Sequence, residues 1–399
     1  MKKFLAMLLA LVMVMGLVAC GGNQPAETKA PAETNAPAES NPAESTPDES
    51  TPAVDGTEYK IAMITDYGDI TDQSFNQTTY EAVKAFGEAN GVDYRYYRPT
   101  GDSTAERESM VEAAIMDGYN VIVMPGFAFG ETLVQVADAY PEIKFVALDV
   151  ADGAGGFHAT ENVFSAVYQE ELSGYMAGYA AVKLGYKHLG YLGGMAVPAV
   201  QRFRYGFLQG VDAAAKELGI VDQIKVEYVY GNQFYGDADI TAVMDTWYGE
   251  KGVECVFACG GGILSSAAEA AAKVGGKVIG VDVDQSATIN GMYGEGMTVT
   301  SALMGLAPTV KNVLTAIVLE DNWAAYAGKI ETLGLVSADP EANYVQIPMA
   351  TTQFAEGFTA DDYKALVAAM FDGTITVSND IANFPVTEVA VEQHANIKG

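Results

Sequence analysis

YKIAMITDYGDITDQSFNQ, residues 59–77, joins an apolar run directly to a loop of carboxylates and amides. The run at 59–65 reads as a β-strand buried on both faces, because its apolar side chains mostly follow one another instead of alternating with polar ones. Ser74 is followed three residues later by Gln77, so a capping box predicts a helix with Ser74 as N-cap and Phe75 as first residue. This pattern leaves two side chains unexplained, Asp66 and Phe75.

The alternation of strand and helix continues along the chain. Apolar strands are expected at 92–98, 120–125, 143–149, 187–194, 224–231, 253–260 and 277–284, with amphipathic helical patterns between them. Strands of this kind predict an α/β fold with parallel sheets that helices cover on both faces. About 340 residues run from Thr57 onward, too many for one ordinary core. Two similar, Rossmann-like lobes are therefore expected.

Each lobe is expected to combine two stretches of chain. Lobe 1 is predicted to comprise residues 58–160 and about 285–335. Lobe 2 is predicted to comprise about 161–284 and 336–399.

Polar, glycine-rich or aromatic loops follow five of the predicted strands. They are DYGDITDQSFNQ at 66–77, GFAFG at 126–130, GNQFYGD at 231–237, GGG at 260–262 and DVDQS at 282–286. In parallel α/β sheets, ligands collect at the carboxyl ends of the strands, where loops and helix N-termini meet. The sequence therefore predicts a ligand cleft between the lobes.

Composition narrows the possible partners. The net charge is -30, with 52 acidic and 22 basic residues, which argues against nucleic acid or an anionic membrane surface as partner. Cys255 and Cys259 would lie roughly 13 Å apart on one strand, beyond the reach of a disulfide. The three histidines form no metal-binding motif, and no phosphate-binding GK[ST] or GxGxxG pattern follows the glycines at 260–262. We expect neither a cofactor nor a metal.

The first residues predict export. Residues 1–20 read as a signal peptide, and their LVAC ending resembles a bacterial lipobox in which Cys20 becomes the lipid-modified first residue. That resemblance implies a lipid anchor on the outer side of the cytoplasmic membrane; the alternative is a plain secreted protein with a chance cysteine. Residues 21–57 repeat Pro, Ala, Glu, Ser and Thr and lack aromatics, so a disordered tether is expected.

Taken in order, seven motifs resemble those of the basic membrane protein family of lipoproteins. They are TDYGDITDQSFNQ, GFAFG, GGMAVPAVQRFRYGFLQGV, the NQF of VYGNQFYGD, ACGGG, IGVDVDQ and TSALM. The resemblance implies a periplasmic-binding-protein type I fold and a substrate-binding component of an ABC importer that captures purine nucleosides. It implies an ABC permease as partner, a monomer, and no enzymatic activity.

The resemblance also implies roles for single residues. Phe75 and Phe234 match the phenylalanines that sandwich the purine, and Asp66 and Asp282 match ligand contacts, Asp282 on the ribose side. Further matched positions are Asn76, Asp149, Gly260 and Gly261. Without the resemblance, ordinary core packing would be the favoured interpretation of either phenylalanine.

One position departs from the family pattern. Where the family commonly has a lysine beside the sugar, at the end of its TS-x-x-K motif, this chain has Met304. The ligand could therefore be another flat heterocycle, such as a free base or a riboflavin-like ring. Two other classes stay open: a nucleoside hydrolase using Asp66, Asp69 and Asp72, and a sensory or adhesive surface lipoprotein.

Overall fold

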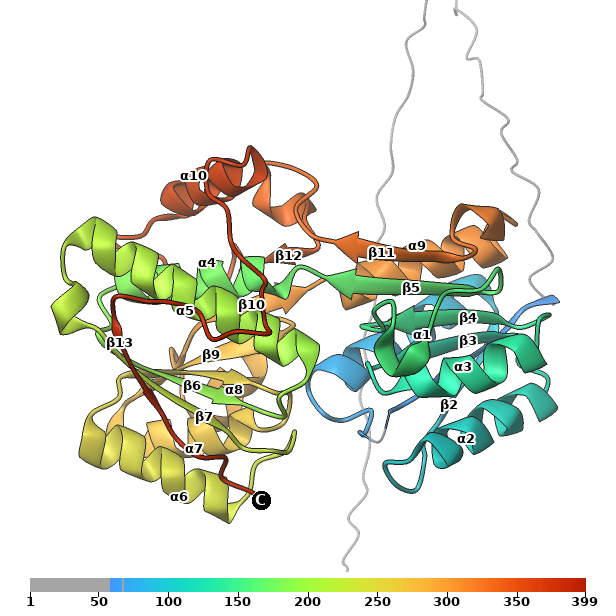
Figure 1. Ribbon diagram of the computed structural model, residues 1–399, viewed down its shortest axis with the longest axis horizontal. Helices are drawn as coiled ribbons and strands as arrows, with labels where there is room; N and C mark the ends of the chain where they lie inside the picture. Colours follow the sequence, from blue (N-terminus) through green and yellow to red (C-terminus); the bar gives the residue numbers. More distant parts are fainter. Residues whose placement is uncertain (1–57, 67) are drawn as a thin grey trace, which may run out of the picture. The chain divides into compact units, whose positions relative to one another are not determined.

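The computed structural model describes residues 58–66 and 68–399, and these contain two sheets whose strands are mostly parallel (Figure 1). The predicted signal peptide, Cys20 and the tether at 21–57 lie outside the described residues. None of the helices in the described part of the chain combines the length and the apolar character needed to cross a membrane.

The first sheet has the strand order β11-β5-β4-β3-β1-β2, with every neighbouring pair parallel. Its strands are β1 (Lys60–Ile64), β2 (Asp93–Tyr97), β3 (Val121–Pro125), β4 (Lys144–Leu148), β5 (Val163–Tyr168) and β11 (Lys329–Leu333). Its helices are α1 (Phe75–Asn90), α2 (Thr104–Met116), α3 (Phe129–Ala139) and α9 (Leu306–Val318). Helices α1 and α9 pack together, as do α2 and α3, and the two pairs contribute to separate hydrophobic cores.

The second sheet has the order β12-β10-β9-β8-β6-β7-β13, and β12 alone among its described strands runs antiparallel to its neighbour. Its strands are β6 (His188–Gly193), β7 (Lys225–Tyr230), β8 (Cys255–Cys259), β9 (Lys277–Asp282), β10 (Thr298–Met304), β12 (Val345–Gln346) and β13 (Ala390–Gln393). The helices that accompany it are α4 (Glu170–Lys183), α5 (Pro198–Leu218), α6 (Ala238–Thr246), α7 (Leu264–Val274), α8 (Ser286–Tyr293) and α10 (Ala360–Phe371).

Short helical turns complete the described secondary structure. They are Ala154–Gly156, Val221–Gln223, Trp247–Lys251, Trp323–Ala325 and Pro340–Ala342.

Glycines allow α4 and α5 to pack with their backbones in contact. A Cβ added at Gly206 on α5 would lie 1.8 Å from the Glu171 carbonyl oxygen, and one at Gly174 on α4 would lie 2.3 Å from the Phe203 carbonyl oxygen. A larger residue at either position would force the helices apart, because the contact is with backbone. The close packing of α4 and α5 therefore brings Glu170 of α4 next to Arg202 of α5.

The predicted α/β fold with parallel sheets is confirmed, and every strand predicted from its apolar run is present. Sheet membership corrects the predicted lobe ranges. Strand β5 belongs to the first sheet, although the range for lobe 1 stopped at residue 160, and β10 belongs to the second sheet, although 285–335 was assigned to lobe 1. The sequence TVTSALM of β10 mixes hydroxyls with apolar residues, so its pairing with the buried strand β9 is not apparent from the pattern.

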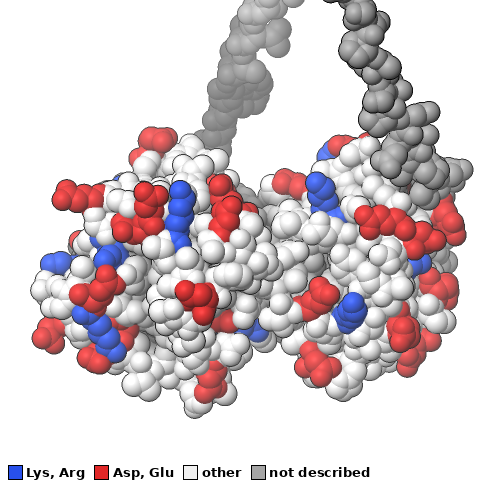
Figure 2. Space-filling model, turned by 90° about the horizontal axis from the view of Figure 1, so that it is seen from above, with Lys and Arg blue, Asp and Glu red and all other residues white. Residues whose placement is uncertain are grey.

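Cys255 and Cys259 are free and fully buried on β8, as the strand pattern indicated. Acidic side chains also outnumber basic ones over the face shown in Figure 2, in keeping with the composition. An acidic face of this kind would repel a polyanion.

Candidate functional site

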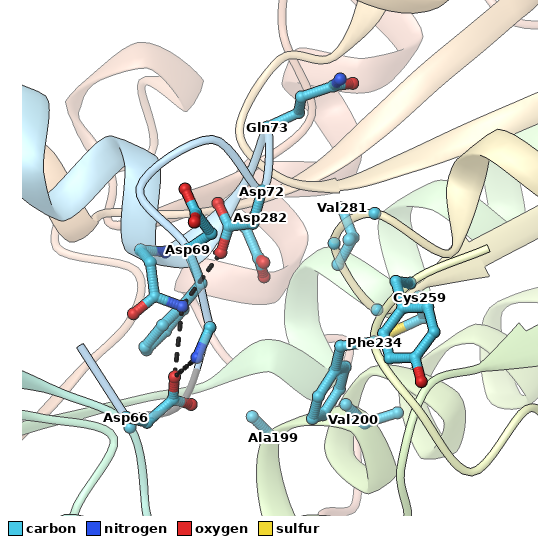
Figure 3. Close-up of a pocket in the computed structure, with 18 of the residues that line it drawn as sticks. Asp66, Asp69, Asp72, Gln73, Ala199, Val200, Phe234, Cys259, Val281 and Asp282 are labelled. Atoms are coloured by element: carbon cyan, nitrogen blue, oxygen red, sulfur yellow. Dashed lines mark hydrogen bonds between the residues drawn. The ribbon is translucent and has the colours of Figure 1, made fainter. Parts of the chain in front are cut away.

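A cavity of about 550 Å³ lies where strands of both sheets end. Its wall includes all eight ligand-contact residues expected from the sequence, which come from loops far apart in the chain: Asp66, Phe75, Asn76, Asp149, Phe234, Gly260, Gly261 and Asp282. In the close-up, Asp66, Asp69, Asp72 and Asp282 are seen on one side and Phe234, Ala199, Val200 and Cys259 on the other (Figure 3). Its volume falls within the roughly 300 to 1,000 Å³ usual for small-molecule sites.

Asp72 stabilises the loop between β1 and α1. Its carboxylate accepts hydrogen bonds from the backbone N–H groups of Ser74, Asn76 and Gln77, so it satisfies the free donors at the start of α1. The predicted capping box is therefore wrong in its bonds, although α1 does begin at Phe75. The Gln77 side chain accepts from Gln73 N instead.

The Ser74 hydroxyl makes no capping bond and instead links the two sheets beside the cavity. Ser74 Oγ donates to Asp282 Oδ2 at 2.5 Å, which joins the start of α1 to the end of β9. Close by, Gln285 Nε2 donates to the Gln73 carbonyl oxygen at 3.0 Å. A Cβ at Gly261 would lie 3.5 Å from Ser74 Cβ, so the glycine-rich turn after β8 also approaches this loop. The two sheets are thus linked at one rim of the cavity.

A buried ion pair makes a second link between the sheets. Arg202 on α5 donates through Nη2 to Asp149 Oδ1 at 3.0 Å, and it also bonds the carboxylate of Glu170. Asp149 follows β4 of the first sheet, and Glu170 begins α4. Nothing near Arg202 in the sequence shows that its partners lie on other elements, so this link was missed.

Asp66 and Asn76 form a small network on the wall of the first sheet. Asp66 Oδ1 accepts from Gly68 N at 2.8 Å and from Asn76 Nδ2 at 3.3 Å, and Asn76 Nδ2 also lies 3.0 Å from Asp72 Oδ2. Both amide hydrogens of Asn76 therefore face carboxylates. Its Oδ1 is buried and has no partner among the described residues.

Burial perturbs two of the wall's carboxyl groups. Burial raises the pKa of Asp282 to about 7, and the hydrogen bond from Ser74 opposes that shift. Burial also raises the pKa of Asp149 well above its usual range, although Arg202 acts in the opposite direction. Desolvation dominates in both cases, so each carboxylate is costly to keep charged without a further partner.

Both phenylalanines of interest are half-buried and face the cavity from different sheets. Phe75 is the first residue of α1, and Phe234 lies in the loop between β7 and α6. A Cβ on Gly194 would come within 2.4 Å of the Phe234 ring, so the ring's place depends on a glycine there. Asn232, two residues before Phe234, has a φ of 63°. The local backbone is thus shaped around this ring.

Sequence reasoning missed part of the wall. Further lining residues include Arg98, Phe127, Phe203, Tyr235, Met292 and Tyr293. Phe127 and Tyr235 lie in the loops at 126–130 and 231–237 that follow two predicted strands, so the sequence does hold a signal for them. Met292 and Tyr293 end helix α8, away from any strand end, and no local pattern marks them.

Away from the cavity, one cluster of acidic and histidine side chains has the spacing of a metal site but is poorly suited to hold a metal ion. Glu227, Glu392 and His394 offer ligand atoms within 4.8 Å of one another. Lys251 Nζ lies 2.8 Å from Glu227, 3.1 Å from Glu392 and 3.5 Å from His394. A protein cation therefore already occupies the position that a metal would need.

Comparison with known proteins gives consistent matches. A family model described as ABC transporter substrate-binding protein PnrA-like matches residues 59–338. The chain is 29% identical over 244 residues to the ABC transporter nucleoside-binding protein BmpA of Lactococcus lactis subsp. cremoris, a match that covers 57% of this chain and 65% of that protein, just under two thirds of its length. It is 27% identical over 287 residues to basic membrane protein B of Borreliella afzelii, covering 70% of this chain and 79% of that one.

The fold has relatives among solved structures. A solute-binding protein of an ABC transporter system from Aeropyrum pernix superposes with a TM-score of 0.61, at 24% identity, over 81% of this chain and 88% of that one. At this identity the likeness shows the fold alone, which is that of the periplasmic binding proteins.

Proposed function

Because the chain belongs to the Bmp family of PnrA-like ABC transporter substrate-binding proteins, we propose that it captures a purine nucleoside in the cavity and delivers it to an ABC permease. The observation that carries the proposal is the pair Phe75 and Phe234, which reach one cavity from two sheets. Two flat apolar faces from opposite lobes suit a planar ring that stacks between them.

The nucleoside is supported by the carboxylates and by one relative. Asp66 and Asp282 would accept hydrogen bonds from ring N–H groups or sugar hydroxyls, and the turn at Gly260 and Gly261 would bring backbone groups to the ligand. The matched protein of Lactococcus lactis is named a nucleoside-binding protein.

Capture would depend on both lobes. A ligand that contacts Phe75 and Phe234 at once favours the state in which the sheets are close, because an open state offers it one ring. The bonds from Ser74 to Asp282 and from Gln285 to Gln73 would form in that state. A permease would then recognise the closed form, and the ligand would leave unchanged.

The acids of the first loop are engaged in holding the loop. Asp72 caps α1, Asp69 accepts from Thr71 and pairs with Arg98, and Asp66 accepts from Gly68 and Asn76. These roles support a binding site rather than a hydrolase. Met304 favours a second candidate ligand, another flat heterocycle, because a thioether cannot replace the hydrogen bonds that a lysine gives to a ribose.

A lipid on Cys20 would hold the protein at the outer face of the cytoplasmic membrane, close to its permease. Metabolic labelling with a palmitate analogue tests this part directly. The label is expected on the wild-type protein, and its persistence after Cys20→Ser would contradict the anchor.

The function is tested by uptake. Cells from which the protein has been deleted should lose uptake of radiolabelled inosine or guanosine at low external concentration, and the wild-type chain should restore it. Undiminished uptake in the deleted cells would contradict the transport role, and release of hypoxanthine from inosine by the purified protein would point to an enzyme.

A further inference from the structure

The wall of the cavity is acidic. Five carboxylates line it, those of Asp66, Asp69, Asp72, Asp149 and Asp282. Among the described lining residues Arg98 is the one basic side chain, and it is bonded to Asp69. Arg202 stands behind the wall and divides its donors between Asp149 and Glu170. Positive charge on this wall therefore falls well short of negative charge.

Four polar side chains of the wall, which include Thr71 and Asn76, each use a donor on the protein itself. The bonds run from Thr71 and Arg98 to Asp69, from Asn76 to Asp66 and Asp72, and from Ser265 to the Gly262 carbonyl oxygen. The phenols of Tyr235 and Tyr293 can donate or accept. A ligand that needs several side-chain donors would find few of them here.

Acceptors are what the wall leaves available. Asn76 is only 5% exposed, and its Oδ1 has no partner among the described residues. Asp282 is 8% exposed, and the described side chains give it a single hydrogen bond, from Ser74. Buried acceptors without donors are costly, so the ligand is the natural source of the missing hydrogen bonds.

Strand β10 of the second sheet adds no charge to balance these acids. Met304 ends β10, directly after Leu303, which pairs with Asp282 in the sheet. Its side chain is 4% exposed and lines the cavity. A lysine at this position could bring an ammonium group to the acids, but a thioether is neutral and a weak acceptor.

We propose that the cavity selects a flat heterocycle that carries a positive charge, such as a ring-alkylated purine nucleoside or base, over its neutral counterpart. This inference rests on the proposed function and narrows its ligand class. The acids and the open acceptors would bind the ligand's charged N–H groups, and the faces of Phe75 and Phe234 would attract the cationic ring.

Two isomers test the inference without changing size or composition of the ligand. 1-Methyladenosine is alkylated on the ring and is a cation near neutral pH, whereas N6-methyladenosine is neutral. Both are titrated into residues 52–399, which form one compact unit, after unfolding and refolding to remove carried ligand. The titrations are done at pH 7.5, above the pKa of about 7 of Asp282, so that this carboxylate is mostly charged while 1-methyladenosine is still a cation. The cation is expected to bind at least tenfold more tightly, and the difference should shrink as salt is added. Equal affinity, or tighter binding of the neutral isomer, overturns the inference.

A second test adds a positive charge to the cavity wall. Met304→Lys should abolish the preference for 1-methyladenosine, because the new ammonium group would take the place of the ligand's charge. Met116→Lys is the matched control, since Met116 is 86% exposed on α2 and does not line the cavity. Thermal unfolding of both variants checks that they fold.

The outcomes separate this inference from the proposed function. If neutral adenosine or guanosine binds and the two isomers bind alike, the function stands and the inference fails. If the added methyl group prevents both isomers from binding, the binding of neutral adenosine is compared between wild type and Met304→Lys. The variant should bind adenosine at least tenfold more tightly, and unchanged affinity overturns the inference. If no purine nucleoside or base binds at all, the proposed function and this inference fail together.

Discussion

Three residues on the cavity wall hold a left-handed backbone conformation that side chains other than glycine rarely adopt. Gln73, Asp149 and Asp282 have φ values of 59°, 62° and 65°. Such conformations cost of the order of 1 to 3 kcal/mol each and persist where the surrounding structure enforces them. Here they turn the chain at the ends of β4 and β9 and before α1, so that carboxylates face the cavity. The folded state therefore tolerates backbone strain at the positions that carry the expected ligand contacts.

Removing either aromatic face should weaken binding. Phe75→Ala and Phe234→Ala are each expected to cost about 1 to 3 kcal/mol of binding free energy, by analogy with bases stacked on aromatic side chains. Calorimetric titration with the best-binding nucleoside measures the loss. Phe371→Ala is the control, because Phe371 is exposed on α10 and lies outside the cavity wall. Unchanged affinity in both cavity variants would remove the sandwich from the account.

Asp282→Asn should change how stability depends on pH. The folded pKa of about 7 lies above the usual value of 3.8, so the folded state binds more protons than the unfolded one between these values, and stability falls as pH rises through this window. The ligand-free variant lacks that fall. Between pH 5 and pH 8 it should gain roughly 2 to 3 kcal/mol in free energy of unfolding relative to wild type.

Urea unfolding at the two pH values measures this difference. Asparagine tolerates a positive φ, so the backbone at 282 is not strained by the change. Asp321→Asn is the matched control, because Asp321 also has a positive φ, 46°, but is exposed. Parallel stability curves for wild type and Asp282→Asn would show that burial does not perturb this carboxyl group.

Among the elements, β13 ties the end of the chain to the loop that carries Phe234. It runs parallel to β7, and beyond it Ile397 N donates to the Tyr230 carbonyl oxygen at 2.9 Å. Lys398 Nζ lies 2.9 Å from Asp237 Oδ2, and Asp237 caps α6 just after that loop. The last strand therefore supports one side of the cavity from behind.

The docking of β13 should depend on Glu227. This side chain is fully buried on β7 and bonds Lys225 and Lys251, with His188 and His394 beside it. Burial raises its pKa, but these hydrogen bonds outweigh that effect and hold the pKa at about 2. Glu227→Gln should lower the free energy of unfolding at pH 7 by about 1.5 to 3 kcal/mol, the usual range for hydrogen bonds to charged groups.

The loss should fade in acid. The folded pKa lies below the usual 4.5, so the stability from Glu227 is fully present above pH 4.5 and is lost as pH falls toward 2. Glu392→Gln is the control: it alters the same cluster, but its side chain is 46% exposed. Equal effects of the two substitutions at pH 7 would contradict the role given to burial.

Local pattern was enough to predict the strands that lead to the cavity, because each is an apolar run followed by a polar loop. It was not enough for β5, β10 or the short strands near the end of the chain, whose place depends on partners far along the sequence. The same limit explains the errors at the site. Ser74 and Asp72 both have side chains that can cap α1, and the choice between them is made by Asp282, which is 208 residues away from Ser74.

For the molecule as a whole, the account requires that ligand binding and closure be one event. Ser74→Ala removes the hydroxyl that joins the start of α1 to Asp282 at the end of β9, so the closed state should lose roughly 1.5 to 3 kcal/mol and affinity should fall by a similar amount. Titration measures the affinity, and X-ray scattering with and without ligand measures the radius of gyration, which should decrease on binding. Ser109→Ala is the control, since Ser109 bonds only within α2 among the described residues. A ligand that binds tightly without compaction would contradict closure.

Calorimetric titration of residues 52–399, unfolded and refolded to remove carried ligand, shows directly whether the cavity captures a nucleoside. The panel comprises inosine, guanosine, adenosine, a pyrimidine nucleoside, free purine bases and riboflavin. We expect saturable binding of at least one purine nucleoside, with one site per chain, that is lost when both Phe75 and Phe234 are replaced by alanine. Binding that survives the double replacement, or no binding to any member of the panel, would contradict this expectation.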